Sequence, residues 1–381
     1  MNARHEVEIV ESLESISAVE WDALSGNEPF CSHAFLSALE NSGCVGARSG
    51  WSPCHLVIRR SGRITGAMPL YRKSHSYGEY VFDWAWAEAY RRHGLRYYPK
   101  LVSAVPFTPV TGSRLLASDA ETKAALIAAA LRFAAEQRMS SLHCLFPIAP
   151  EAQLMQQAGM LIRQTVQFHW RNDGYSSFDD FLGRMNHDKR KKIRQERTKL
   201  RASGIRLERL SGTEAGEAHW KFFFDCYRRT YRAHQSTPYL NLEFFLRLAH
   251  LMPQRLLLSV AVRDGRPIAS SLCVRGESAL YGRYWGAVEY HPGLHFECCY
   301  YQPIEHCIEQ GIACFEGGAQ GEHKLARGLL PIRTLSAHWL AHPRFFDAVA
   351  DFLRRERRDV EQYVDELGEH SPFKTPAGAR D

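Results

Sequence analysis

The residues best suited to chemistry lie together in one short segment, FEGGAQGEHK, over residues 315–324. Glu316 is able to take a proton from an amine, and Gln320 is able to donate a hydrogen bond to a carbonyl oxygen. His323 exchanges protons near neutral pH, and the Lys324 ammonium is able to stabilise an oxyanion or a phosphate. Transfer of an acyl group to an amine needs these functions: proton removal, carbonyl polarisation and oxyanion stabilisation.

Three glycines, Gly317, Gly318 and Gly321, separate these side chains. Glycine has no Cβ, so its backbone N–H groups can come close to a substrate, and these positions are candidate substrate contacts. An ordinary polar turn with an exposed carboxylate at a strand end gives the same pattern. The sequence leaves both interpretations open.

A second group of candidates lies upstream, in the segment from Gly282 to Gln302. Glu297 is a candidate catalytic carboxylate, although the helix dipole also favours an acid in the first turn of a helix. Aromatic side chains here are predicted to line a groove for the acyl group or its acceptor, with core packing as the alternative. They are Trp285, Tyr284, Tyr300 and Tyr301. In the first half of the chain, His75 and Tyr77 are predicted to face the same site.

A basic segment over residues 184–202 is predicted to form one long helix. Met185, Ile193 and Leu200 recur near the helical repeat, so a thin apolar stripe should dock while the charged faces stay in water. A run of like charges repels itself unless an anionic partner offsets it. A solvated linker helix is the alternative. The candidate contacts to an anionic donor are Lys189, Arg190, Lys192 and Arg194.

Length and composition limit the class of protein. A chain of 381 residues suits two domains, and 45% hydrophobic with 24% charged residues is typical of a soluble globular protein. The N-terminal segment lacks the apolar core of a secretory signal, and no segment reaches the apolar length of a membrane helix. These features predict a cytoplasmic protein.

The ten cysteines are scattered, and no C-x-x-C pair occurs. This pattern predicts small buried thiols in a reducing compartment rather than a zinc or redox motif. We therefore expect no metal site and no tightly bound cofactor.

The scaffold for these residues is predicted to be of the α/β (α+β) class. Residues 118–138 and 343–370 have strong helical patterns, whereas residues 255–287 form a meander of strands. Strands in a meander, followed by helix and strand units, indicate mixed sheets with helices on both faces.

Two hairpin segments resemble each other. RSGRITGAMPLYRKSHSYGEYVF, residues 60–82, parallels RDGRPIASSLCVRGESALYGRYW, residues 263–285. Each predicts a hairpin through a basic turn, a polar break and then an aromatic strand. Either chance or an internal duplication explains the similarity. Duplication predicts two like-built domains, 1–165 and 166–381, with a cleft between them.

Four segments together resemble the FemAB-like proteins of the GNAT superfamily, which are described as predicted N-acyltransferases of peptidoglycan biosynthesis. They are PFTPVTGSRLL, KSHSYGEYVFDWAWAEAY, GRYWGAVEYHPGLHFECCYYQPIEHCI and FEGGAQGEHKLARGLLP. The resemblance implies tandem GNAT-like domains of the acyl-CoA N-acyltransferase fold, and transfer of an acyl or aminoacyl group to an amine. In the related Fem ligases the donor is aminoacyl-tRNA and the acceptor is a muropeptide precursor, and a lysine of the second domain acts as proposed for Lys324.

The donor stays open between aminoacyl-tRNA and acyl-CoA. GNAT enzymes that use acetyl-CoA usually carry Arg/Gln-x-x-Gly-x-Gly/Ala, whose backbone N–H groups hold a pyrophosphate. Here Arg91-x-x-Gly94 and Arg201-x-x-Gly204 match only the first half of that motif. Three hypotheses follow: a transferase that uses aminoacyl-tRNA, an acyl-CoA-dependent N-acetyltransferase of a small molecule, or a non-catalytic protein that binds a cell-wall precursor or RNA.

Overall fold

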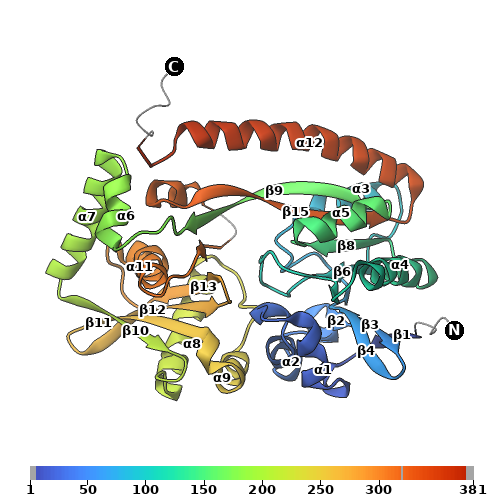
Figure 1. The fold of residues 1–381 in the computed structure, drawn as a ribbon, viewed down its shortest axis with the longest axis horizontal. Coiled ribbons are helices and arrows are strands. Elements are labelled where there is room, and N and C mark those ends of the chain that lie inside the picture. The colour runs from blue at the N-terminus through green and yellow to red at the C-terminus, as the bar shows by residue number, and fades with distance from the viewer. Residues whose placement is uncertain (1–5, 319–320, 375–381) are drawn as a thin grey trace. The chain divides into compact units, whose positions relative to one another are not determined.

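The computed structural model describes residues 6–318 and 321–374 (Figure 1). The chain forms two compact units. Unit 1 combines residues 1–165 with 333–361, and unit 2 combines 166–332 with 362–381. The predicted division at residue 165 matches the first of these boundaries, but residues 333–361 group with unit 1 rather than with the second half. The predicted cleft between domains stays a prediction.

Unit 1 contains two sets of paired strands. The first is antiparallel, in the order β1 (Glu6–Val10), β3 (His55–Arg60), β4 (Arg63–Met68) and β7 (Leu116–Ala117). The second has the order β15 (Leu330–Leu340), β8 (Ser141–Leu145), β6 (Lys100–Ser103), β5 (Tyr71–Lys73) and β2 (Trp51–Pro53). Strands β6 and β8 are parallel, and the chain between them includes a long helix.

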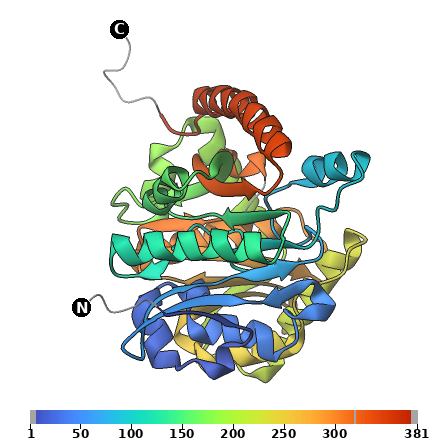
Figure 2. The same ribbon diagram turned by 90° about the vertical axis from the view of Figure 1, so that its right-hand side faces the viewer.

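The described α-helices of unit 1 include two that begin at a side-chain cap. In chain order, the helices are α1 (Ala18–Ser25), α2 (His33–Asn41), α3 (Trp84–Arg92), α4 (Ala120–Glu136) and α5 (Ala149–Gln157). Ser32 accepts a hydrogen bond from the Phe35 backbone N–H, and Asp119 accepts one from Thr122. Helix α4 lies across the strands (Figure 2) and buries Leu126 and its neighbours in the core of the unit.

Unit 2 is built on a sheet with one parallel pairing among its described strands. Its order is β10 (Ile205–Ser211), β11 (Leu256–Arg263), β12 (Arg266–Arg275), β13 (Ala279–Ala287), β14 (Cys314–Glu316) and β9 (Leu161–Arg171). Strand β14 is parallel to β13 and antiparallel to β9. Glu316 therefore lies beside Tyr281 on one side and His169 on the other.

Helices cover both faces of this sheet, with α8 and α9 on one side and α11 on the other (Figure 1). The helices of unit 2 are α6 (Phe178–Arg184), α7 (His187–Ala202), α8 (Glu217–Ala233), α9 (Leu242–Leu251), α10 (Leu294–Phe296) and α11 (Gln302–Glu309). A π-helix (Glu297–Tyr301) joins α10 to α11, and a 3₁₀ helix spans Glu322–Arg327.

Three elements run from one unit into the other along the chain: β9, β15 and α12 (Pro343–Glu369). The helix predicted over residues 343–370 is confirmed as α12.

The two hairpins that suggested a duplication share their turn geometry. Ser61 and Gly62 have φ of 50° and 80°, and Asp264 and Gly265 have φ of 50° and 72°. Each hairpin also shifts its register before the turn, after Ile58 and after Ala261. The similarity ends there, since the aromatic strand predicted at the end of residues 60–82 is wrong. This stretch is a loop leading into α3, held by buried charges described below.

The single helix predicted over residues 184–202 is also wrong at its start. Helix α6 ends at Arg184, and α7 begins at His187. The Asn186 side chain accepts a hydrogen bond from the Lys189 backbone N–H, which caps α7 and breaks the run. Met185 is buried, but it lies between the helices rather than on the docked face of α7.

Candidate functional site

The predicted chemical segment lies at the end of β14, within unit 2. Glu316 is the last residue of the strand and is buried. Arg283 Nη2 of β13 donates to Glu316 Oε2 at 3.3 Å, and His169 Nδ1 of β9 lies 3.8 Å from Oε1. Burial, together with the charges of Arg283 and Lys324, lowers the pKa of His169 to about 3. The ionic partner of Glu316 is therefore Arg283.

Lys324 is a buried lysine whose hydrogen-bond partner is a backbone carbonyl. Its Nζ donates to Gly318 O at 2.8 Å. Burial, reinforced by the charge of Arg283, lowers the pKa of Lys324 to about 8. Within residues 6–318 and 321–374, no carboxylate forms an ion pair with it. The positive charge of Lys324 is therefore not neutralised by an ion pair with any of the described side chains.

The glycines shape the chain around Lys324. A Cβ on Gly317 would lie 2.7 Å from Leu329 Cδ2 and 3.2 Å from Tyr300 Cε1, so only glycine fits without a shift. Gly318 has φ of +87°, which other residues rarely adopt, and this turns its carbonyl toward Lys324. Gly321 lies against the His323 ring. Gln320 lies outside the described residues, and its role stays a prediction.

His323 is exposed and contacts Tyr300. Its Nε2 lies 3.0 Å from the Tyr300 hydroxyl. Partial burial and the charges of Lys324 and Arg327 lower the pKa of His323. Burial, and then the charge on His323, lowers the pKa of the adjacent His295 to about 4. Both imidazoles are therefore neutral at pH 7 and able to accept a proton.

The π-helix at Glu297–Tyr301 is a feature that sequence reasoning missed. Such segments are rare and occur frequently at functional sites. It sends its last two side chains to different partners, since Tyr300 contacts His323 while the Tyr301 hydroxyl donates to Glu196 Oε2 of α7 at 2.5 Å. We know of no sequence signal that would have predicted it.

Glu297 is not among the contacts of the Glu316 and Lys324 group. Arg197 of α7 lies 3.0 Å from Glu297 Oε1, and Gln302 Nε2 donates to the same oxygen at 2.8 Å. Arg197 also pairs with Glu305 at 2.8 Å. These contacts fasten α7 to α11, so Glu297 has a structural role in the geometry observed, and its catalytic role stays a prediction.

The four candidate groove aromatics divide into two pairs. Tyr300 lies at His323, and the Trp285 ring lies 5.2 Å from His295, so both are near the site. Tyr284 packs against Tyr227 and Phe245 of the aromatic layer under α8 and α9. Tyr301 is fully buried beside α7.

Helix α7 presents a basic face. Ile193, Leu200 and the unpredicted Arg197 form its buried side. The other side lines an open groove made by His187, Arg190, Lys191, Arg194, Gln195, Thr198 and Lys199. Two of the predicted anion contacts, Arg190 and Arg194, line this groove, and Lys192 is exposed elsewhere on the helix. Arg194 also pairs with Asp179 at 3.0 Å.

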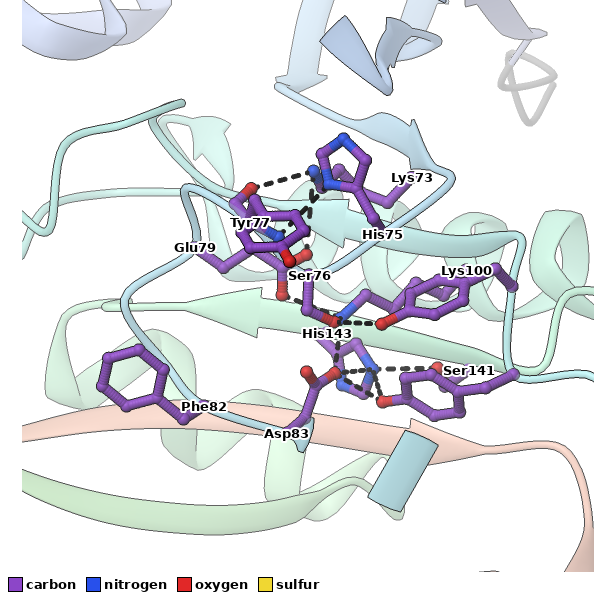
Figure 3. Close-up of polar contacts among 12 residues, drawn as sticks. Lys73, His75, Ser76, Tyr77, Glu79, Phe82, Asp83, Lys100, Ser141 and His143 are labelled. Atoms are coloured by element: carbon purple, nitrogen blue, oxygen red, sulfur yellow. Dashed lines mark hydrogen bonds and ion pairs between the residues drawn. The ribbon is translucent and has the colours of Figure 1, made fainter. Parts of the chain in front are cut away.

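Unit 1 holds a second cluster of charged groups, which sequence reasoning did not find (Figure 3). Lys100 of β6 is fully buried, and its Nζ donates to Ser76 Oγ and to Glu79 Oε2, each at 2.8 Å. It also donates to Asp83, the residue before α3. Lys100 thereby ties the loop between β5 and α3 to the sheet.

Lys73 extends this buried network at the end of β5. Its Nζ donates to Tyr77 O at 3.2 Å, lies 3.9 Å from Glu79 Oε1 and sits 3.8 Å from the centre of the Trp51 ring. Trp51 Nε1 donates to the same Tyr77 carbonyl at 3.1 Å. The backbone of the loop is thus held at Tyr77 by two side chains.

A chain of hydrogen bonds continues from Asp83. The Tyr97 hydroxyl donates to Asp83 Oδ2 at 2.5 Å and lies 3.0 Å from His143 Nε2. His143 Nδ1 in turn lies 2.8 Å from His338 Nδ1. Burial, and then the charge of Lys100, lowers the pKa of His143 to about 3, so this end of the network is uncharged.

Burial and neighbouring charges shift the pKa values of the ionisable groups in this network. Burial lowers the pKa of Lys73 to about 7 and raises the pKa of Glu79 to about 7. Burial is the largest influence on Asp83 and opposes its ionisation, but the neighbouring charges, Lys100 first, and the hydrogen bonds that Asp83 accepts together outweigh it and lower the pKa of Asp83 to about 2. Burial likewise opposes the charge of Lys100, yet Glu79 and Asp83 raise its pKa.

His75 and Tyr77, predicted to bind substrate, belong to this loop. His75 Nδ1 accepts a hydrogen bond from the Tyr77 backbone N–H at 3.2 Å, and the Tyr77 side chain is exposed. Their role in binding stays a prediction. Only the local part of the network has a signal in the sequence: one lysine and two acids, Lys73, Glu79 and Asp83, lie in a stretch otherwise rich in aromatics.

The cysteines match the expectation of small buried thiols. All ten cysteines are free thiols, mostly buried. Among the described residues, no group of three or more His, Cys, Asp or Glu side chains is arranged to hold a metal ion. None of the described helices is both long and apolar enough to cross a membrane.

Comparison with solved structures shows the fold. The structure of FemX has a TM-score of 0.55 at 11% identity and covers 88% of this chain and 98% of that one. The C-terminal domain of a putative lysylphosphatidylglycerol synthetase from Agrobacterium fabrum gives 0.53 at 9% identity, over 88% and 95%. L-PGS from Bacillus licheniformis gives 0.51 at 10% identity, over 86% and 97%. The predicted pair of GNAT-like domains with mixed sheets is confirmed.

The family follows from the sequence itself. A search of curated proteins finds no significant match. A family model named FemAB_like and described as peptidoglycan biosynthesis/recognition matches residues 12–375, nearly the whole chain. Family and fold together support a transferase of acyl or aminoacyl groups. The chain belongs to the FemAB-like family.

Proposed function

We propose that this protein is an N-acyltransferase that moves an aminoacyl or acyl group onto the amine of a cell-wall precursor. The observation that carries the proposal is Lys324, a buried ammonium held by a backbone carbonyl beside Arg283. A buried cation without a counter-ion costs stability, so such a group is typical of a site where negative charge arrives. The oxyanion of a tetrahedral intermediate is a charge of that kind.

The neighbouring groups supply the remaining steps. The amine attacks the donor carbonyl, and Lys324 donates a hydrogen bond to the carbonyl oxygen as negative charge develops there. Neutral His323 takes the proton of the attacking amine, with Tyr300 fixing the ring. The new C–N bond forms, the bond from the carbonyl carbon to the leaving oxygen or sulfur breaks, and His323 returns the proton to the leaving group.

Glu316 has a positioning role in this scheme. Its carboxylate is hydrogen-bonded to Arg283. The charge of Arg283 also adds to burial in lowering the pKa of Lys324. Glu316 therefore positions the Arg283 guanidinium, and the charge of Arg283 in turn lowers the pKa of Lys324.

We assign the donor as aminoacyl-tRNA rather than acyl-CoA. Two observations favour it: the solvent-facing basic groove of α7 and the incomplete pyrophosphate motif. The description of the family, peptidoglycan biosynthesis/recognition, favours a cell-wall precursor as acceptor. The cytoplasmic location predicted from the sequence suits both substrates and remains a prediction.

A donor test distinguishes the alternatives. Full-length protein is incubated with a bacterial small-molecule extract and either radiolabelled aminoacyl-tRNA or acetyl-CoA, and label in new amides is followed. The proposal expects label from aminoacyl-tRNA, lost in Lys324→Met. Label only from acetyl-CoA would overturn the donor assignment. Transfer from neither, with a cell-wall precursor bound, would favour the non-catalytic hypothesis.

A further inference from the structure

Exposed apolar side chains concentrate in one part of unit 1. Among the described residues, eight large hydrophobic side chains are exposed, and four of them fall within residues 77–95. Their exposed fractions are 57% for Tyr77, 53% for Phe82, 41% for Trp84 and 39% for Leu95. The other four are spread over both units, so this concentration is a property of one segment.

Three of these side chains lie at the start of α3. The rings of Tyr77 and Trp84 meet edge to face with centroids 5.0 Å apart. Figure 3 shows the Phe82 ring apart from the buried network, with none of the drawn contacts. Trp86, about 200° further around the helix than Trp84, packs in the core with Leu353 of α12. Helix α3 therefore buries one face and leaves Trp84 on the other.

The far end of the same helix is basic. Arg91, Arg92 and Arg96 are exposed, and Glu88 is the one acidic residue between Trp84 and Arg96. Glu88 already accepts hydrogen bonds from Arg91 and Arg92, at 2.7 Å and 2.9 Å. Three arginines against one glutamate leave a net charge of +2 on residues 84–96.

The buried network holds this segment in place. Lys100 binds Glu79 and Asp83 on either side of Phe82, and Lys73 binds the carbonyl of Tyr77. Arg163 Nη1 donates to the Phe82 carbonyl at 2.7 Å. Apolar side chains on a fixed backbone lose little conformational entropy when they bind. The geometry is that of a pre-formed binding surface.

We infer that residues 77–96 dock the protein on an anionic lipid surface. The aromatic end would enter the headgroup region, where Trp and Tyr rings are favoured, and the arginines would face lipid phosphates. A protein partner fits less well, because the three rings expose roughly 300 Å² if each side chain offers about 200 Å². A stable protein interface needs about 800 Å² from each partner. The inference does not rest on the transferase proposal.

Vesicle co-sedimentation of the full-length protein tests this inference. Vesicles of phosphatidylcholine, with and without phosphatidylglycerol, are compared. Binding is expected to require phosphatidylglycerol and to fall at least about tenfold in the double variant Phe82→Ser, Trp84→Ser. The matched control is Tyr290→Ser, an 89% exposed ring in unit 2, which should bind as the unchanged protein does. Thermal unfolding confirms that each variant is folded.

Charge variants separate this surface from the basic helix α7. Arg91→Gln with Arg92→Gln and Arg96→Gln should weaken binding to anionic vesicles by roughly fivefold per arginine. Neutralising Lys189 to Lys192 should have the smaller effect. The inference is overturned if the α7 variant loses vesicle binding while the Phe82 and Trp84 variant keeps it, or if neither kind of vesicle binds the unchanged protein.

Discussion

Two buried lysines, one in each unit, have opposite surroundings. Lys100 in unit 1 meets Glu79 and Asp83, and these carboxylates raise its pKa. Lys324 in unit 2 meets the carbonyl of Gly318 and the charge of Arg283, and its pKa falls to about 8. Both side chains are almost completely removed from water. Burial alone therefore does not show what a charged residue does.

The difference lies in the countercharge. A buried cation with matched carboxylates is a structural element, because removing it strands two anions. A buried cation without such carboxylates lowers the stability of the folded state, because no ion pair offsets the loss of its hydration. The contrast assigns structure to the network of unit 1 and chemistry to Lys324, and each assignment makes measurable predictions.

The largest effect is expected from Lys100→Met. This change leaves Asp83 buried without its lysine and Glu79 with only the more distant Lys73, so the free energy of unfolding should fall by about 3–5 kcal/mol. Urea denaturation followed by circular dichroism measures it. Lys324→Met is the matched control and should keep or gain stability, because it removes an uncompensated charge. Equal losses in the two variants would remove the contrast between the units.

Lys324→Met should abolish most of the transfer activity. Loss of one oxyanion donor typically lowers kcat by about 10²–10³-fold. In the unchanged protein, activity should decline as the pH rises through about 8, where the ammonium loses its proton. Lys324→Arg keeps a cation at higher pH and should move this decline upward. A decline that stays at the same pH in Lys324→Arg would contradict the role of the ammonium.

The free energy of unfolding should also depend on pH because of Lys324. Its pKa is lowered from 10.5 to about 8 in the folded state. A lowered pKa means that the folded protein favours the neutral form of Lys324. The free energy of unfolding is therefore highest above pH 10.5, and it decreases as the pH falls from 10.5 to about 8. The change is on the order of 3 kcal/mol at most. Unfolding measured across this range should show the dependence, and Lys324→Met should reduce it.

Neutralising the basic groove should weaken donor binding without affecting the chemistry at Lys324. Changing Lys189, Arg190, Lys191 and Lys192 to Gln removes two cations of the groove, Arg190 and Lys191, and two others at the start of α7. Affinity for tRNA should drop, and the slope of its logarithm against the logarithm of salt concentration should become shallower by roughly 0.7 for each phosphate that is no longer neutralised. Filter binding at several salt concentrations measures both. An unchanged slope would exclude α7 as the tRNA-binding helix.

The smallest effect is expected from Tyr300→Phe. It removes the hydroxyl beside His323 Nε2 while keeping the ring, so kcat should fall about two- to tenfold. Tyr290→Phe, at an exposed position, is the control and should leave kcat unchanged. A matching loss in the control would show that the effect is not specific to His323.

Sequence reasoning found the parts of the fold that depend on neighbouring residues. The hairpin turns and α12 follow from local patterns, and the structure confirms them. The caps at Ser32, Asp119 and Ser177 depend on equally local contacts. The segment at Glu316 was placed at a strand end, where the structure has it. The break at Asn186 was missed because continuous basic residues masked an ordinary capping signal.

Long-range contacts were beyond that reasoning. The network of unit 1 joins Lys73, Asp83, Lys100, His143 and His338, which come from distant parts of the sequence. Each is ordinary by itself, and only the paired strands β5, β6, β8 and β15 bring them together. The π-helix that places Tyr300 likewise depends on packing rather than on local preference.

The return of residues 333–361 to unit 1 has a consequence for synthesis on the ribosome. Strand β8 pairs with Ser336–Leu340 of β15, so one edge of β8 has no partner until the chain has been made past Leu340. At about 5–20 residues per second, the ribosome needs roughly 10 to 30 s to cross residues 166–332. The first unit to begin translation is therefore completed only after most of the second has been made, and its open edge is a target for chaperones and for aggregation during that interval.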